Sequence, residues 1–187
     1  MSELSDLRDR LPEVARDIKL NLQAVLQSEA LSKSQLWGVA ITSALAARSE
    51  RLRAALTAEA ARVLEPAQHR AVVDDARAAS VLMAMNNVFY RFRHMVDKAS
   101  YAEKPARLRM NRLGKPATDK LTFELCCLVA SAINGCETCV QAHERVVVTG
   151  GISEDAVHDA IRLAATVQAA ALALELPLDD STVAAVA

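Results

Sequence analysis

The chain has 187 residues, 52% of them hydrophobic, and a formal net charge of −1, so it is long enough to bury a core and is not a short disulfide-stapled scaffold. With 36 Ala, 3% aromatic residues and only five Gly and five Pro, it is expected to be all-α rather than all-β. The near-neutral charge argues against general nucleic-acid binding, and no apolar stretch reaches the roughly 20 residues of a membrane span.

Hydrophobic periodicity predicts a series of helices in the first half of the chain. Pro12 fits the first turn of the first helix, and Ser32 or Ser34 can cap the second. The apolar pattern of the second helix is lost near Arg48. The helices are expected over residues 12–28, 32–48, 51–64 and 66–96.

A connector is expected between the two halves. Pro105, Gly114 and Pro116 interrupt this part of the chain, and it has no sustained apolar period. From Arg91 to Lys120, nine Lys or Arg residues face three Asp or Glu residues. This surplus suggests either a surface that steers an acidic partner or a solvated connector.

Three helices are predicted in the second half. Thr118 and Asp119 can cap the first, which ends at Asn134-Gly135, where positive φ is tolerated. The next helix starts there and runs to Gly150. Ser153 opens a last, Ala-rich helix that ends near Leu176.

A weak internal repeat relates residues 40–47 to residues 128–135 at an offset of 88. We expect two related helical halves, although Ala-rich helices can also match by chance. At this offset Arg48 and Arg51 stand where the second half has two cysteines, so only the second half is expected to carry chemistry. A single domain, residues 1–187, is therefore predicted. It consists of a helical half without a site (1–96), a basic connector (97–120), a helical half with the site (121–178) and a frayed tail (179–187).

The second half contains a Cys-x-x-Cys motif followed by a histidine: Cys136, Cys139 and His143. Residues three and seven apart return to one face of a helix, so these side chains form a stripe. Because Asn134-Gly135 precedes the first turn, both sulfurs are expected near a helix N-terminus, where unpaired N–H groups favour thiolate. The motif therefore predicts reactive cysteines.

Glu124 is expected to face His143. If the helices on either side of Asn134-Gly135 form an antiparallel pair, positions equidistant from the turn meet, and these two residues are equidistant from it. A carboxylate beside the imidazole fixes its tautomer and raises its basicity, which makes His143 a general base for a thiol.

Metal binding is the main alternative for the cysteines. Tetrahedral zinc needs two more ligands, and Cys126 and Cys127 are adjacent on a helix, where neighbouring side chains point about 100° apart. We interpret both as small buried hydrophobes and predict no metal. A thioredoxin-like fold is not expected because no βαβ pattern surrounds the motif. The other histidines have no comparable neighbours: His69, His94 and His158.

Residues 83–90 gather two aromatic residues, two methionines and two adjacent asparagines. Such a cluster is either core or subunit interface, or a wall of the thiol site that guides a lipid-like substrate and excludes water.

Glu124 with Cys136-x-x-Cys139-x-x-x-His143 resembles the active-site motif of the alkyl hydroperoxidase D (AhpD) family, an all-helical family with the carboxymuconolactone decarboxylase-like fold. Further segments similar to that family cover nearly the whole chain: Leu11-Pro-Glu, Ala15 to Leu22, Gln35-Leu-Trp-Gly38, Met85 to Arg91, Leu108-Arg-Met-Asn111 and Ser131 to Cys136.

The resemblance implies a homotrimer that reduces organic hydroperoxides and regenerates the peroxiredoxin AhpC. Electrons would come from a lipoylated dihydrolipoamide acyltransferase kept reduced by dihydrolipoamide dehydrogenase, so dihydrolipoamide is an external reductant and no cofactor is bound.

The resemblance also implies roles for the motif residues. Cys139 would be the peroxidatic thiol that passes through sulfenic acid, Cys136 the resolving thiol and proton donor, and His143 with Glu124 the proton relay. A Cys136–Cys139 disulfide would close the cycle. Thr138 departs from the family pattern, which has a second histidine between the cysteines.

Two other functions remain open from the sequence: a carboxymuconolactone-type decarboxylase, which would not need both thiols, and a zinc-binding structural protein. Met1 to Arg10 carries five charged side chains and resembles neither a secretory signal nor a transit peptide. A cytoplasmic location, without membrane or nucleic-acid partners, is therefore expected.

Overall fold

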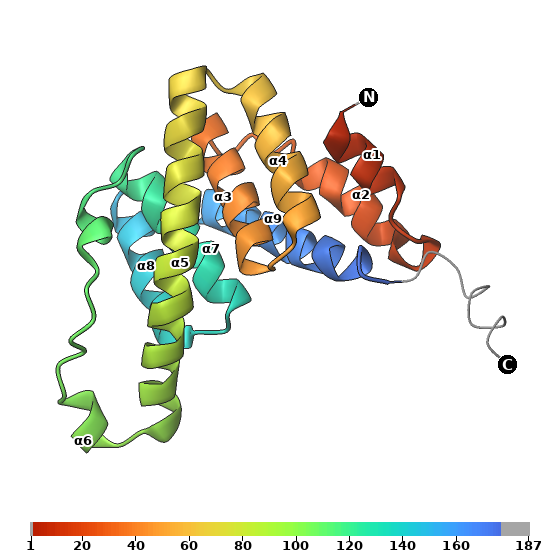
Figure 1. Ribbon diagram of the computed structural model, residues 1–187. Helices are drawn as coiled ribbons and strands as arrows, with labels where there is room; N and C mark the ends of the chain where they lie inside the picture. Colours follow the sequence, from red (N-terminus) through yellow and green to blue (C-terminus); the bar gives the residue numbers. More distant parts are fainter. Residues whose placement is uncertain (1, 177–187) are drawn as a thin grey trace, which may run out of the picture.

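The computed structural model describes residues 2–176, and in this part of the chain every regular element is a helix (Figure 1). The all-α prediction is therefore confirmed for the described residues. The elements are α1 (Glu3–Asp9), η1 (Glu13–Ala15), α2 (Arg16–Val25), α3 (Lys33–Ala46), α4 (Glu50–Val63), α5 (Pro66–Val96), α6 (Ala99–Ala102), η2 (Asn111–Gly114), α7 (Lys120–Ile133), α8 (Glu137–Thr149) and α9 (Glu154–Ala173).

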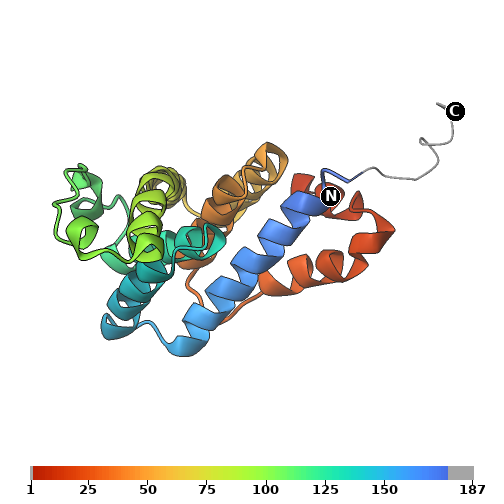
Figure 2. The same cartoon turned by 90° about the horizontal axis from the view of Figure 1, so that it is seen from below.

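Helices α3 and α7 form the centre of the fold. Helix α3 packs against α4, α5, α7 and α9, and α7 packs against α3, α5, α8 and α9. The two central helices approach closely at Gly38, where an added Cβ would lie 3.1 Å from the Cys126 sulfur. The long helix α5 covers one side, and α9 runs beside α2 on the other (Figures 1 and 2).

The predicted helix boundaries agree with the structure for α3, α4, α5, α7, α8 and α9 to within a few residues. Ser32, Asp119 and Ser153 act as the predicted N-caps, each accepting a backbone N–H hydrogen bond. The prediction of a helix from residue 12 is wrong at its start: a short 3₁₀ turn, Glu13–Ala15, comes first, and its Val14 is 85% exposed. Helix α1 was not expected, because its few apolar residues give too short a pattern.

The expected repeat is visible in the helix positions. Helix α7 starts 87 residues after α3 (120 against 33), α8 starts 87 after α4 (137 against 50), and α9 starts 88 after α5 (154 against 66). The turns before α4 and α8 also correspond, because Arg48 and Gly135 both have positive φ (58° and 67°). In each turn the next residue donates its N–H five residues back, Ser49 to Ala44 and Cys136 to Ser131.

The sequence repeat pairs Arg48 and Arg51 with the two cysteines at an offset of 88. The starts of α4 and α8 give 87, which moves each partner in the first half by one residue. Ser49 stands for Cys136, Leu52 for Cys139 and Leu56 for His143. The two leucines are buried in the core. The first half therefore uses these positions for packing, and only the second half presents ionisable groups there.

The connector is held to α5 by a buried carboxylate. Asp75 accepts hydrogen bonds from the backbone N–H groups of Ala117 and Thr118, from the Thr118 hydroxyl at 2.6 Å and from Arg112 at 2.7 Å. These bonds fix the chain immediately before α7, so part of the basic connector serves packing rather than solvation alone.

The predicted tail, 179–187, falls outside the described residues. None of the helices within 2–176 is long and apolar enough to cross a membrane.

Candidate active site

The two cysteines of the motif lie at the start of α8 with their sulfurs close together. Cys136 is the N-cap residue, Cys139 lies in the first turn, and their Sγ atoms are 2.6 Å apart with both residues as free thiols. The positive φ of Gly135 turns the chain directly from α7 into this cap. Cys136 is fully buried, whereas Cys139 retains 6% exposure, so an approaching molecule reaches Cys139 first.

The predicted partnership of Glu124 and His143 is present. Glu124, at the middle of α7, accepts a hydrogen bond from Nδ1 of His143, one turn beyond Cys139 on α8, at 2.6 Å. Both side chains are largely buried, at 12% and 14% exposure. A carboxylate on Nδ1 leaves Nε2 as the basic atom of the ring.

Burial is the main influence on the pKa of the Cys139 thiol. It raises the pKa of Cys139 from its ordinary value of 9.0 to about 12; the neighbouring Cys136 thiol also raises it, while a hydrogen bond from Asn87 lowers it. The expected position at a helix N-terminus is confirmed, but the expected preference for thiolate is wrong, since desolvation outweighs the helix terminus. A base must therefore remove the Cys139 proton before it can attack.

Asn87 of α5 joins the site, although the sequence placed it only within the 83–90 cluster. Its Nδ2 donates to the Ser131 hydroxyl at 3.0 Å, and its Oδ1 accepts from the side chain of Asn134 at 2.9 Å. Arg91, one turn further along α5, donates to the Asn134 backbone carbonyl. We call Asn87, Arg91 and Asn134 the turn bracket, because they fix the turn that carries Cys136.

Cys126 and Cys127 lie outside the site. Both are buried in a cluster with Ala79, Met83 and Phe123, as expected for small hydrophobes. Burial raises the pKa of Cys126 to about 12 and raises that of Cys127 further. Within the described residues, no group of three or more Cys, His, Asp or Glu side chains is arranged to hold a metal ion.

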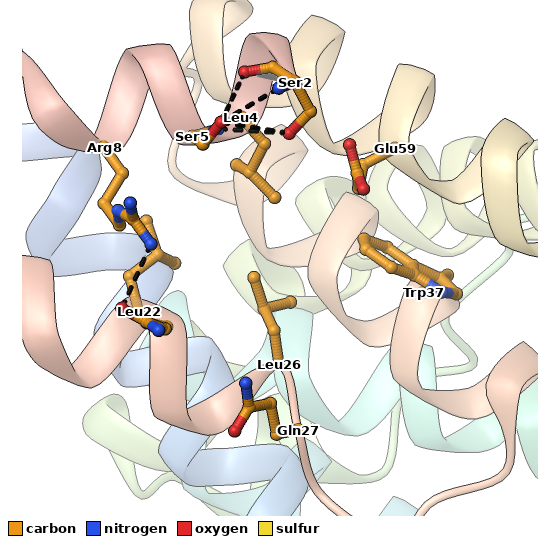
Figure 3. A pocket seen from close by; sticks show the side chains of 10 residues that line it. Ser2, Leu4, Ser5, Arg8, Leu22, Leu26, Gln27, Trp37 and Glu59 are labelled. Carbon is orange, nitrogen blue, oxygen red and sulfur yellow. Dashed lines mark hydrogen bonds between the residues drawn. The ribbon is translucent and has the colours of Figure 1, made fainter.

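A pocket of about 240 Å³ lies between α1, α2, α3 and α4, away from the cysteines (Figure 3). Four of its polar residues form hydrogen bonds with one another. Ser2 and Ser5 form the capping box of α1, and Arg8 donates a hydrogen bond to the Gln23 amide oxygen at 3.1 Å. Trp37, which forms part of its wall, occupies the position 87 residues before Glu124. The pocket contains none of the predicted site residues.

The chain is similar to known proteins over most of its length. Residues 99–176 match the model of the carboxymuconolactone decarboxylase family. Proteins called alkyl hydroperoxide reductase AhpD are similar over most of their length. The one from Anaeromyxobacter dehalogenans is 65% identical, over 94% of this chain and 92% of that protein. The one from Gluconacetobacter diazotrophicus is 46% identical, over 92% of this chain and 92% of that protein. The one from Rhodopseudomonas palustris is 42% identical, over 96% of this chain and 97% of that protein.

The chain therefore belongs to the AhpD family. Thr138, the expected departure from the family motif, is exposed on the first turn of α8 and makes no side-chain hydrogen bond within residues 2–176.

Proposed function

We propose that this protein is an alkyl hydroperoxide reductase that reduces organic hydroperoxides with the Cys136 and Cys139 thiols. The observation that carries the proposal is the 2.6 Å approach of the two sulfurs one helical turn from a buried His143–Glu124 pair. Such an arrangement supplies a nucleophile, a second thiol and a base oriented by a carboxylate. The relatives named alkyl hydroperoxide reductase support the same chemistry.

In the first step, His143 accepts the Cys139 proton, directly or through one water, and the thiolate attacks the terminal oxygen of the hydroperoxide. The O–O bond breaks, the alcohol leaves with a proton, and Cys139 becomes sulfenic acid. Cys139 takes this role because it is the less buried residue of the two. Cys136 donates the proton that the leaving alkoxide takes up.

In the second step, Cys136 attacks the sulfenic sulfur, water leaves and a disulfide closes. One hydroperoxide and two thiols thus give one alcohol, one water and one disulfide. Dihydrolipoamide, an external reductant, reopens the bridge by thiol–disulfide exchange and becomes lipoamide. No bound cofactor is needed.

The proposed electron route starts at dihydrolipoamide dehydrogenase and passes through a lipoylated dihydrolipoamide acyltransferase to this protein and on to the peroxiredoxin AhpC. The cytoplasm, a reducing compartment, suits a dithiol that must be re-reduced in each cycle.

We further propose a homotrimer whose interface includes one face of α5. Val81, Phe92 and Met95 share that face and are 72%, 46% and 74% exposed, and Phe92 stacks edge-on with Tyr101. Exposed apolar side chains grouped on one helix face are typical of a subunit interface.

The proposed function is tested by assaying reduction of cumene hydroperoxide with dihydrolipoamide, with and without a lipoylated carrier and AhpC. The Cys139→Ser variant should lose turnover, and the Cys126→Ser variant, which changes a thiol outside the site, is the matched control. Full activity of Cys139→Ser would contradict the proposal.

A decarboxylase is the second candidate, because the family matched by residues 99–176 carries that name. Decarboxylation does not require both thiols. Alkylating Cys136 and Cys139 should therefore abolish the proposed reductase and spare a decarboxylase. Zinc in stoichiometric amount with no redox cycling would instead favour a metal-binding protein.

A further inference from the structure

A cavity of about 160 Å³ lies between the end of α3 and the middle of α5, directly behind the turn bracket. Asn87, Arg91 and Asn134 line it, and so does Arg48 at the turn after α3. Leu45 and Val88 contribute apolar wall. It is smaller than the about 300 Å³ at which sites for whole drug-sized ligands begin, so it suits the end of a molecule or a small ligand.

The residues that line the cavity include two arginines and no Asp or Glu. In the described part of the chain, neither Arg48 nor Arg91 forms an ion pair with a carboxylate. Arg91 uses one N–H on the Asn134 carbonyl, which leaves further donors of its guanidinium available. Two guanidinium groups at one cavity favour an anion, and their planar forks match a carboxylate.

Arg48 occupies a position that the backbone makes unfavourable for it. Its φ is 58°, in the left-handed region where a side chain is strained, and the corresponding turn of the second half has Gly135. A strained residue at a cavity is the kind of observation from which a functional role is argued. Here the strained residue is one of the two arginines that line the cavity.

We propose that this cavity binds a small aliphatic monocarboxylate, with the carboxylate between Arg48 and Arg91 and the chain against Leu45 and Val88. The mixed wall favours such an acid over a fully hydrophilic anion. Because Arg91 also holds the Asn134 turn, the bound acid lies beside the segment that positions Cys136.

The test is isothermal titration calorimetry of the reduced, full-length protein with sodium octanoate, with octanamide and inorganic phosphate as parallel titrants. Octanoate should bind saturably, and octanamide and phosphate at least about tenfold more weakly, because each lacks either the charge or the chain. Equal binding of octanoate and octanamide, or of octanoate and phosphate, would overturn the proposal.

Substitutions of the arginines that line the cavity test whether octanoate binds there. Arg48→Gly should weaken octanoate binding at least about tenfold while raising the Tm, because glycine relieves the positive φ. Arg91→Gln should weaken binding similarly, and Arg77→Gln, an exposed arginine of α5 away from the cavity, should leave it unchanged. Unchanged affinity in both Arg48→Gly and Arg91→Gln would contradict the site. The measurement needs no peroxide turnover, so its failure is distinguishable from failure of the proposed function.

Discussion

Glu124 of α7 and His143 of α8 lie 19 residues apart in the chain, and a 2.6 Å hydrogen bond joins them across the turn at Asn134 and Gly135. The pair links the two helices that frame the cysteines. In the proposed mechanism it turns a buried, protonated thiol into a nucleophile.

The first prediction concerns this pair. Glu124→Gln should lower kcat for hydroperoxide reduction by about 10- to 100-fold, because the amide cannot stabilise the imidazolium that forms when the thiol ionises. His143→Gln should cost at least about 100-fold. Steady-state kinetics check both values, with Glu144→Gln, the residue next to His143, as the control. Equal activity of Glu124→Gln and wild type would remove the relay from the mechanism.

The second prediction concerns pH and thiol reactivity. Because burial raises the pKa of Cys139 to about 12, free thiolate is scarce at neutral pH, and alkylation by iodoacetamide should accelerate from about pH 8 to pH 11. Mass spectrometry of the Cys139 peptide gives the rate at each pH. A rate already on its plateau at about pH 7 would show that the thiolate is stable at rest.

The same shift predicts a pH dependence of stability. A thiol whose folded pKa lies above its unfolded value of about 9 holds its proton longer in the folded state, so its contribution is present below pH 9 and is lost as pH rises toward 12. The slope is about 1.4 kcal/mol per pH unit for one such thiol. Urea unfolding should show a shallower decline for Cys139→Ser than for wild type; identical slopes would exclude this linkage.

The third prediction concerns Asn87. Replacing it by Leu leaves the Ser131 hydroxyl and the Asn134 side chain without their partner, which should cost about 1–3 kcal/mol of unfolding free energy. Because the bracket fixes the turn before Cys136, the dithiol–disulfide potential should also shift, as measured in glutathione buffers. Asn86→Leu, at a buried neighbour whose Oδ1 has no hydrogen-bond partner in the described structure, should leave the potential unchanged. If both variants had the wild-type potential, the bracket would be only a structural support.

The fourth prediction concerns the proposed trimer. Met95→Glu places a charge on the exposed apolar face of α5 and should shift the protein toward monomers in analytical ultracentrifugation. Val14→Glu, on the equally exposed η1, should not change the mass. A monomeric wild-type protein, or a Met95→Glu trimer, would contradict this interface.

Local sequence signals predicted most of the fold. The capping residues Ser32, Asp119 and Ser153 and the 3.6-residue apolar period located the helices, because both act within a few residues of the chain. Counting from the turn also predicted the meeting of Glu124 and His143, since an antiparallel helix pair fixes which positions face each other.

Other features of the site depend on packing between distant helices. Asn87 reaches Ser131 and Asn134 from α5, and no local pattern distinguishes it from Asn86. The thiol pKa was predicted in the wrong direction because helix position is local, whereas desolvation depends on what covers the sulfur. The repeat offset was wrong by one residue at the turn before the cysteines, because the sequence match of residues 40–47 to 128–135 gives 88, whereas the positive φ of Arg48 and Gly135 pairs the two turns at 87.

The most direct test of the dithiol chemistry is a single turnover. Reduced protein is mixed with one equivalent of cumene hydroperoxide and no reductant, quenched, and digested without reduction for mass spectrometry. We predict one equivalent of cumyl alcohol, a peptide with Cys136 and Cys139 joined by a disulfide, and Cys126 and Cys127 still free. Alcohol formation with Cys136 and Cys139 both still reduced, or no alcohol at all, would contradict the account.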